Sequence, residues 1–116
     1  MELAEMIKQV KSRPDLDKAG MILCHNGVVR GTTRGGAPIS ELTVRADRER
    51  LAAIIAEIKS RPGILDVLVE IREGLLHVGD DLMYIVVAGD IRENVFAAMM
   101  DTLNRIKAEV TKKEER

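Results

Sequence analysis

A short run in the first third of the chain combines cations, hydroxyls and glycines. It reads RGTTRGG over residues 30–36, with guanidinium groups on Arg30 and Arg34. Glycines allow backbone N–H groups to turn toward an anion, hydroxyls donate hydrogen bonds, and guanidinium groups grip oxygens in pairs. The run lacks the Gly-Lys-Ser/Thr ending of a P-loop. It is therefore either an anion-binding loop or a connector between strands, and on its own it favours the connector.

Further cations lie in the C-terminal quarter of the chain. Arg92 stands near the start of the last expected helix, where unpaired N–H groups favour anions. Lys107 stands near the other end of that helix, where a lysine also offsets the helix dipole. For Lys107 alone this ordinary role is the favoured interpretation. Lys112 and Lys113 on their own are typical of a solvated tail.

Cys24 and His25 are the remaining side chains suited to chemistry. Adjacent residues on a strand point to opposite faces, so these two cannot close on one metal ion without distortion. The only other histidine is His77, and we expect no metal site. Cys24 is expected to be a buried, protonated thiol that packs as a small hydrophobic side chain. A cysteine nucleophile paired with a histidine stays open, although the spacing does not support it.

Composition limits the classes of function. The 116 residues suit one domain, and the formal net charge of -1 favours neither nucleic acid nor an acidic membrane surface. Aromatic residues make up 2% of the chain, too few for a platform on which bases stack. One cysteine fits a reducing compartment, and neither a secretory signal nor a membrane span is expected. We therefore expect a cytoplasmic protein.

Apolar periodicity predicts the elements that position these side chains. Helices are expected over residues 3–10, 47–61 and 90–110, the second capped by Asp47 and the third opened by a capping box of Asp90 and Glu93. Strands are expected over residues 21–29, 40–45, 65–71 and 82–88, and the last reads as a central strand covered on both faces. The expected buried face of the last helix comprises Phe96, Met99, Met100, Leu103, Ile106 and Val110.

This order of elements predicts an α+β fold with a mixed, mainly antiparallel sheet and helices packed against it. Residues 1–116 are expected to form a single domain. Within it, residues 1–18 form an N-terminal helix and connector, and residues 112–116 form a tail that frays.

Three segments, in the right order, resemble the large, catalytic subunit of molybdopterin synthase. The family's Phe-x-Gly-x-Val-Arg strand end is matched by HNGVVR at residues 25–30. Its His-Arg-x-Gly-x-Leu-x-Val-Gly-Asp/Glu segment is matched by IREGLLHVGD at residues 71–80, and its His-Arg-x-x-x-Phe helix start by IRENVF at residues 91–96. A closing Leu-Lys is matched by Ile106-Lys107, and the resemblance runs from about Gly20 to Lys113.

The resemblance implies a sulfurtransferase that converts cyclic pyranopterin monophosphate to molybdopterin. Sulfur would arrive as a thiocarboxylate on the Gly-Gly tail of a small ubiquitin-like carrier subunit. By position, Lys107 and Lys113 would be the catalytic lysines, Lys112 being the alternative to Lys113. Arg30 and Arg92 would bind the substrate, with Arg34 beside them. Arg92 and Lys107 match residues that the family places in one pocket, yet they stand at opposite ends of one helix. A homodimer in which each site takes one of them from each copy is therefore expected.

The chain also departs from the family pattern. Ile91 stands where the family has a histidine, His25 replaces a phenylalanine, and the family's C-terminal extension is missing. These departures favour a second function, a non-catalytic relative that binds the carrier or a pterin. A generic α/β ligand-binding domain with no link to the cofactor is a third interpretation. We expect no cofactor, no metal, no nucleic-acid partner and no membrane association.

Overall fold

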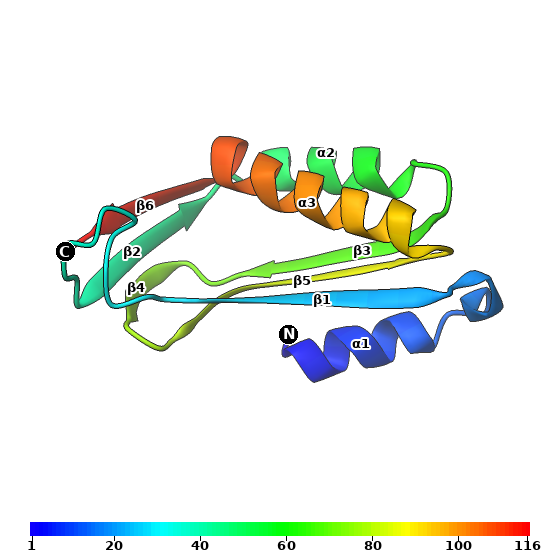
Figure 1. The fold of residues 1–116 in the computed structure, drawn as a ribbon, viewed down its shortest axis with the longest axis horizontal. Helices are drawn as coiled ribbons and strands as arrows, with labels where there is room; N and C mark the ends of the chain where they lie inside the picture. The colour runs from blue at the N-terminus through cyan, green and yellow to red at the C-terminus, as the bar shows by residue number, and fades with distance from the viewer.

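The computed structural model describes residues 1–116 (Figure 1). The helices are α1 (Leu3–Lys11), a short 3-10 helix η1 (Leu16–Lys18), α2 (Arg48–Lys59) and α3 (Arg92–Glu109). The strands are β1 (Met21–Val28), β2 (Glu41–Ala46), β3 (Ile64–Ile71), β4 (Gly74–His77), β5 (Asp81–Gly89) and β6 (Thr111–Glu115). None of the helices combines the length and apolar character that crossing a membrane requires.

The strands form two sheets of three strands each, with the orders β1-β5-β3 and β4-β2-β6. Every pairing is antiparallel. The predicted α+β class is confirmed, but the single mixed sheet is wrong. After β1 the chain leaves the first sheet through residues 29–40 and starts the second with β2, as Figure 1 shows on the left.

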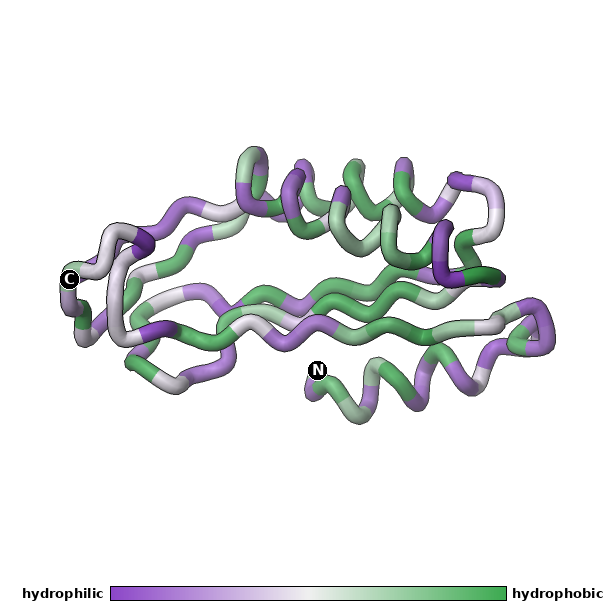
Figure 2. Tube along the Cα trace, viewed as in Figure 1, coloured by the Kyte–Doolittle hydropathy of each residue, from purple (hydrophilic) through white to green (hydrophobic).

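β5 is the central strand that the apolar run predicted. It pairs with β1 on one side and β3 on the other. Ile85 and Val87 belong to the main core under α2 and α3, whereas Val86 and Ala88 belong to a smaller core under α1. Both faces of the strand are therefore covered, which explains its unbroken hydrophobicity (Figure 2).

The two longer helices begin in different ways. The Asp47 side chain accepts a hydrogen bond from the Arg50 amide at 3.0 Å, which confirms the predicted cap of α2. The capping box predicted at Asp90 and Glu93 is wrong. The prediction fails because α3 starts one residue later than expected. Ile91 occupies the N-cap position and makes no capping hydrogen bond with its side chain. The Asp90 carboxylate instead accepts from the Ile91 amide at 2.6 Å and from the Asn94 side chain at 2.9 Å.

The buried face of α3 is only partly the predicted one. Met99, Ile106 and Val110 are buried and Leu103 is partly buried, as expected. Phe96 and Met100 are 54% and 62% exposed, so their predicted burial is wrong. The helix instead turns smaller residues inward: Val95, Ala98 and Thr102. The Thr102 hydroxyl donates to the Ala98 carbonyl at 2.7 Å, so burying it leaves no unpaired polar group.

The predicted frayed tail is also wrong. Residues 111–115 form β6, which pairs with β2 and places Lys113 opposite Val44. Backbone hydrogen bonds between Arg116 and Glu41 extend the ladder. The pairing uses main-chain groups, so it does not need an apolar sequence, and a charged strand suits the exposed edge of a sheet. β6 therefore holds Lys113 in a defined position.

Candidate functional site

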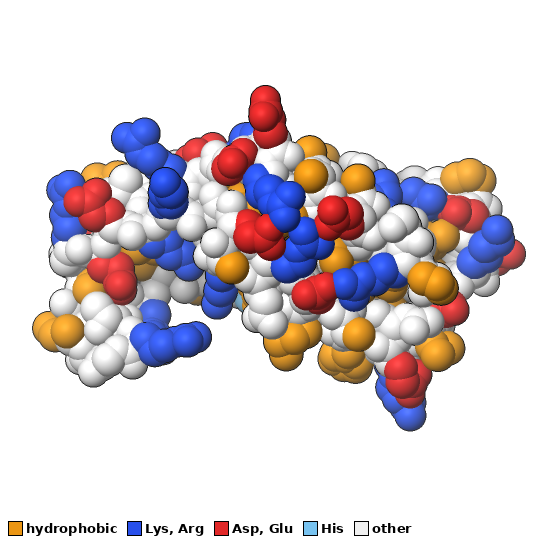
Figure 3. Space-filling model, turned by 90° about the horizontal axis from the view of Figure 1, so that it is seen from above, with side chains coloured by type: hydrophobic (Ala, Val, Ile, Leu, Met, Phe, Trp, Pro, Cys, Tyr) orange, Lys and Arg blue, Asp and Glu red, His pale blue; other side chains and the backbone are white.

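A pocket of about 630 Å³ lies where β1, the loop after it, the end of α3 and β6 meet. It is lined by His25, Gly27, Val28, Val29, Arg30, Thr32, Arg34, Ile39, Leu42, Leu82, Met83, Lys107, Thr111, Lys113 and Glu115. Figure 3 shows Lys and Arg side chains gathered around a hollow at the end of the molecule that carries the second sheet. Four predicted site residues line this pocket: Arg30, Arg34, Lys107 and Lys113.

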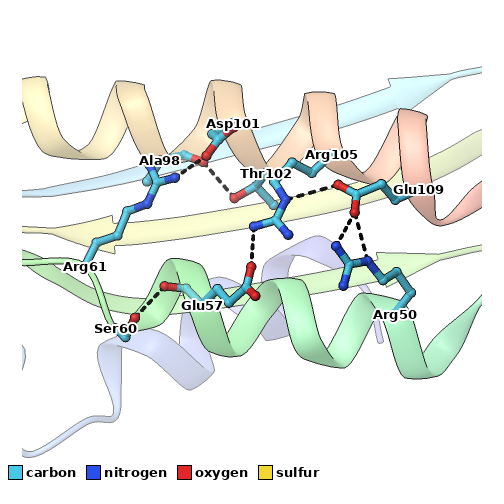
Figure 4. Close-up of polar contacts among 9 residues, drawn as sticks. All are labelled: Arg50, Glu57, Ser60, Arg61, Ala98, Asp101, Thr102, Arg105 and Glu109. Atoms are coloured by element: carbon cyan, nitrogen blue, oxygen red, sulfur yellow. Dashed lines mark hydrogen bonds and ion pairs between the residues drawn. The ribbon is translucent and has the colours of Figure 1, made fainter.

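Lys107 is positioned by the packing of α3 on α2. Arg105 on α3 pairs with Glu57 of α2 at 2.5 Å and with Glu109 at 3.2 Å, and Arg50 of α2 also pairs with Glu109 (Figure 4). Each exposed pair contributes little on its own, but together they select one rotation of α3. Two residues along a helix correspond to about 200°. Lys107 therefore projects away from α2 and toward the pocket.

Lys113 reaches the pocket from β6. Neighbouring side chains of a strand alternate between faces, and Lys113, not Lys112, lines the pocket. Burial lowers the pKa of Lys113, and the nearby charge of Lys107 lowers it further, while Glu115 acts in the opposite direction. Lys113 therefore releases its proton more readily than an ordinary lysine.

The glycine-containing run at residues 30–36 forms a hydrogen-bonded loop along one wall. The Thr33 amide donates to the Ala37 carbonyl at 2.8 Å, and Gly36 has a φ of 94°. The Arg30 Nε donates to the Thr32 carbonyl at 3.1 Å, which anchors one edge of its guanidinium group. The run is thus a connector that also contributes two guanidinium groups to the pocket, those of Arg30 and Arg34.

Arg92 does not share this pocket. It lines a smaller pocket with Gly20, Met21, Ile91 and Glu93, and its side chain is 78% exposed beside Glu93. Fifteen residues of continuous helix separate Arg92 from Lys107, which corresponds to about 22 Å. Within one chain, these two predicted site residues lie at opposite ends of α3.

Cys24 and His25 lie on opposite faces of β1, as the alternation of a strand requires. Cys24 is exposed, so its predicted burial is wrong, because α1 leaves this part of the face uncovered. The remaining partial burial raises the pKa of its thiol. No group of three or more His, Cys, Asp and Glu side chains is placed to hold a metal ion.

The sequence interpretation missed two titratable residues of the pocket, His25 and Glu115. Burial lowers the pKa of His25, and the charge of Lys107 lowers it further. The period of two along β1 could have placed His25 on the pocket face with Gly27. Glu115 could not have been found while the tail was expected to fray. Four cations, one carboxylate and one imidazole around a cavity of this size suit a small anionic ligand.

Known proteins resemble this chain over nearly all of its length. A protein of Haloferax volcanii called "probable molybdopterin synthase" is 29% identical over 113 residues, which cover 93% of this chain and 43% of that protein. The chain thus spans less than half of that relative.

Three solved structures share the fold. Molybdopterin synthase from Staphylococcus aureus is 24% identical with a TM-score of 0.82, covering 100% of this chain and 85% of that one. Molybdopterin cofactor biosynthesis protein E from Burkholderia multivorans is 26% identical with a TM-score of 0.80, covering 99% and 80%. The complex of subunits 1 and 2 of molybdopterin-converting factor from Helicobacter pylori is 16% identical with a TM-score of 0.74. This match covers 99% of this chain and 78% of that one.

The family profile described as MoaE protein matches residues 1–109, from the first helix to the last residue of α3. The match includes the predicted site residues Arg30, Arg34, Arg92 and Lys107, and ends just before β6. Since it covers far more than half of the sequence, the chain belongs to the MoaE protein family.

Proposed function

We propose that this chain is the sulfur-transferring subunit of a molybdopterin synthase. It would convert cyclic pyranopterin monophosphate to molybdopterin with sulfur from a thiocarboxylated carrier. One observation carries the proposal: in a chain of the MoaE family, Arg30, Arg34, Lys107 and Lys113 converge on one pocket from three separate parts of the fold. The similar proteins of Haloferax volcanii and Staphylococcus aureus are both named as molybdopterin synthases, which supports the same activity.

The charges of the pocket suit this chemistry. A phosphate-bearing pterin and a thiocarboxylate are both anions, so bringing them together requires cations between them. Arg30 and Arg34 would hold the phosphate through paired N–H groups. Lys107 would stand beside the reacting carbon. Lys113, with its lowered pKa, would exchange the proton of the reaction.

The proposed partner is a small carrier subunit with a Gly-Gly tail. The Helicobacter pylori structure is named as a complex of two subunits of molybdopterin-converting factor, which supports a two-protein assembly. A tail of two glycines is narrow enough to enter a pocket of about 630 Å³ beside a substrate. We also assign the assembly to the cytoplasm, where the single cysteine would stay reduced.

We further propose a homodimer in which each site takes Lys107 from one copy and Arg92 from the other. The separation of these residues within one chain supports it. Phe96 and Met100 lie exposed on α3 between them, and a second copy would cover both. A two-fold interface produces two equivalent shared sites.

A second candidate is a non-catalytic relative that binds the carrier or a pterin. It is favoured by Ile91, which stands at the start of α3 beside Arg92 and cannot transfer a proton. In this case the pocket would bind without turnover.

Reconstitution separates the two candidates. The purified chain is mixed with thiocarboxylated carrier and cyclic pyranopterin monophosphate, and the dithiolene product is measured. We expect product with the parent and with Lys112→Ala, whose changed residue does not line the pocket, and none with Lys107→Ala. No product from a folded parent that binds the carrier would select the non-catalytic relative.

A further inference from the structure

His25 lies in the wall of the pocket, on the face of β1 that α3 covers. It stands opposite Ile85 of β5, whose side chain belongs to the main core. Gly27 is the next residue on the same face of the strand. A Cβ atom at Gly27 would lie 3.2 Å from the His25 Nε2 atom, which is a crowded distance. The missing side chain therefore leaves room for the edge of the imidazole ring.

The charged groups that share the pocket with His25 belong to α3, to the loop after β1 and to β6. α3 contributes Lys107, while β5 presents only the apolar Met83 and Ile85. The remaining charged groups of the pocket are Arg30 and Arg34 in the loop and Lys113 and Glu115 on β6. Burial and Lys107 both lower the pKa of His25 from its usual 6.5, and no carboxylate opposes them. The ring of the unliganded protein is therefore neutral at pH 7.

We propose that His25 contacts the anionic ligand of this pocket and takes up one proton when the ligand binds. The inference rests on the proposed function only in requiring that the pocket binds an anion. An anion offsets the cations that disfavour a charged ring, and it accepts a short hydrogen bond from the imidazolium. His25 then becomes an additional cation around the ligand. It is the one imidazole in the pocket, since the other histidine, His77, lies on β4 outside it.

The proposal predicts a direction for the pH dependence of binding. Because the pKa of His25 is low in the free protein and higher in the complex, the extra affinity is fully present below the free-state pKa. It is lost as the pH rises through the bound-state pKa. A rise of one unit in the pKa corresponds to tenfold tighter binding on the acid side.

Sulfate is a suitable probe because it remains a dianion across the range in which histidine titrates. The pKa of each of the two histidines is measured by NMR on the Cε1–H signals, with and without sulfate, at ionic strength matched with sodium chloride. His77→Gln assigns the signals. We expect sulfate to raise the pKa of His25 by about one unit and to leave His77 unchanged. A shift of His25 no larger than that of His77 would overturn the proposal.

A calorimetric titration with sulfate provides the second measurement. In the parent and in His77→Gln, we expect sulfate to bind more tightly at pH 5 than at pH 8. The gain should approach about tenfold as the pH falls below the free-state pKa of His25. In His25→Phe, which fills the space without titrating, this pH dependence should disappear. A pH dependence that persists in folded His25→Phe would assign the proton to another group and overturn the proposal. Neither measurement requires turnover, so failure of the sulfur-transfer reaction would leave both results unaffected.

Discussion

Lys107 on α3 and Lys113 on β6 line the same pocket, and the charge of Lys107 contributes to the lowered pKa of Lys113. Neither residue would be placed there by its own local sequence. Lys107 depends on the rotation of α3 against α2, and Lys113 depends on the pairing of β6 with β2. The pair is therefore a product of tertiary structure.

Replacement of Lys107 by methionine should raise the pKa of Lys113. Methionine keeps much of the side-chain volume but removes the neighbouring charge that disfavours a second cation. Burial remains, so the pKa should stay below the ordinary lysine value of 10.5. The measurement is an NMR titration of lysines labelled with ¹³C at Cε. Lys112→Met is the matched control and should leave Lys113 unchanged. An unchanged pKa in Lys107→Met would show that the two lysines are not electrostatically coupled.

Replacement of Arg30 by alanine should weaken the binding of a phosphate-bearing pterin with little change in Tm. Arg30 is exposed and makes one hydrogen bond within the chain, to the Thr32 carbonyl. Loss of a hydrogen bond from a charged group should cost about 1.5–3 kcal/mol of binding free energy. Calorimetry measures the affinity, and thermal unfolding measures the stability. Arg45→Ala removes an exposed arginine outside the pocket and should bind like the parent. Equal affinities for all three proteins would exclude Arg30 from the ligand site.

Replacement of Phe96 by glutamate should weaken the proposed dimer. Phe96 is 54% exposed on α3, and a second copy packed on this helix would have to bury the new carboxylate. The dissociation constant should rise at least about tenfold, since a buried charge without a partner is costly. Sedimentation across a concentration series measures it. Leu75→Glu changes a residue of similar exposure, 53%, on β4 and should dimerise like the parent. If Phe96→Glu and Leu75→Glu both dimerise with the dissociation constant of the parent, α3 is not part of the interface.

The parts of the fold that were predicted from sequence are those with a strong local signal. The unbroken apolar run of β5 identified the central strand, and Asp47 marked the start of α2. Local signals failed where a neighbouring element decides the outcome. Phe96 and Met100 have the spacing of a buried face, but α3 turns Ala98 and Thr102 inward because it packs against both α2 and the first sheet.

The candidate site was predicted unevenly for the same reason. Arg30 and Arg34 were found because their loop has a distinctive composition, and Lys107 was found through the resemblance to a family. The charged sequence of residues 111–115 carries no strand signal, because its pairing with β2 uses only backbone groups. His25 was not predicted to be a site residue, since nothing in its sequence neighbourhood indicates that Lys107 lies near it.

The most direct test of a site shared between two copies uses two damaged subunits. Arg92→Ala and Lys107→Ala homodimers should each be inactive in the reconstituted synthase reaction, because every site in them lacks one cation. After subunit exchange, each mixed dimer contains one site with both residues and one site with neither. Random exchange makes half of the dimers mixed, so an equimolar mixture should recover about a quarter of the parental activity. Verified mixed dimers with no recovered activity, or a parent that sediments as a monomer at the assay concentration, would contradict the shared site.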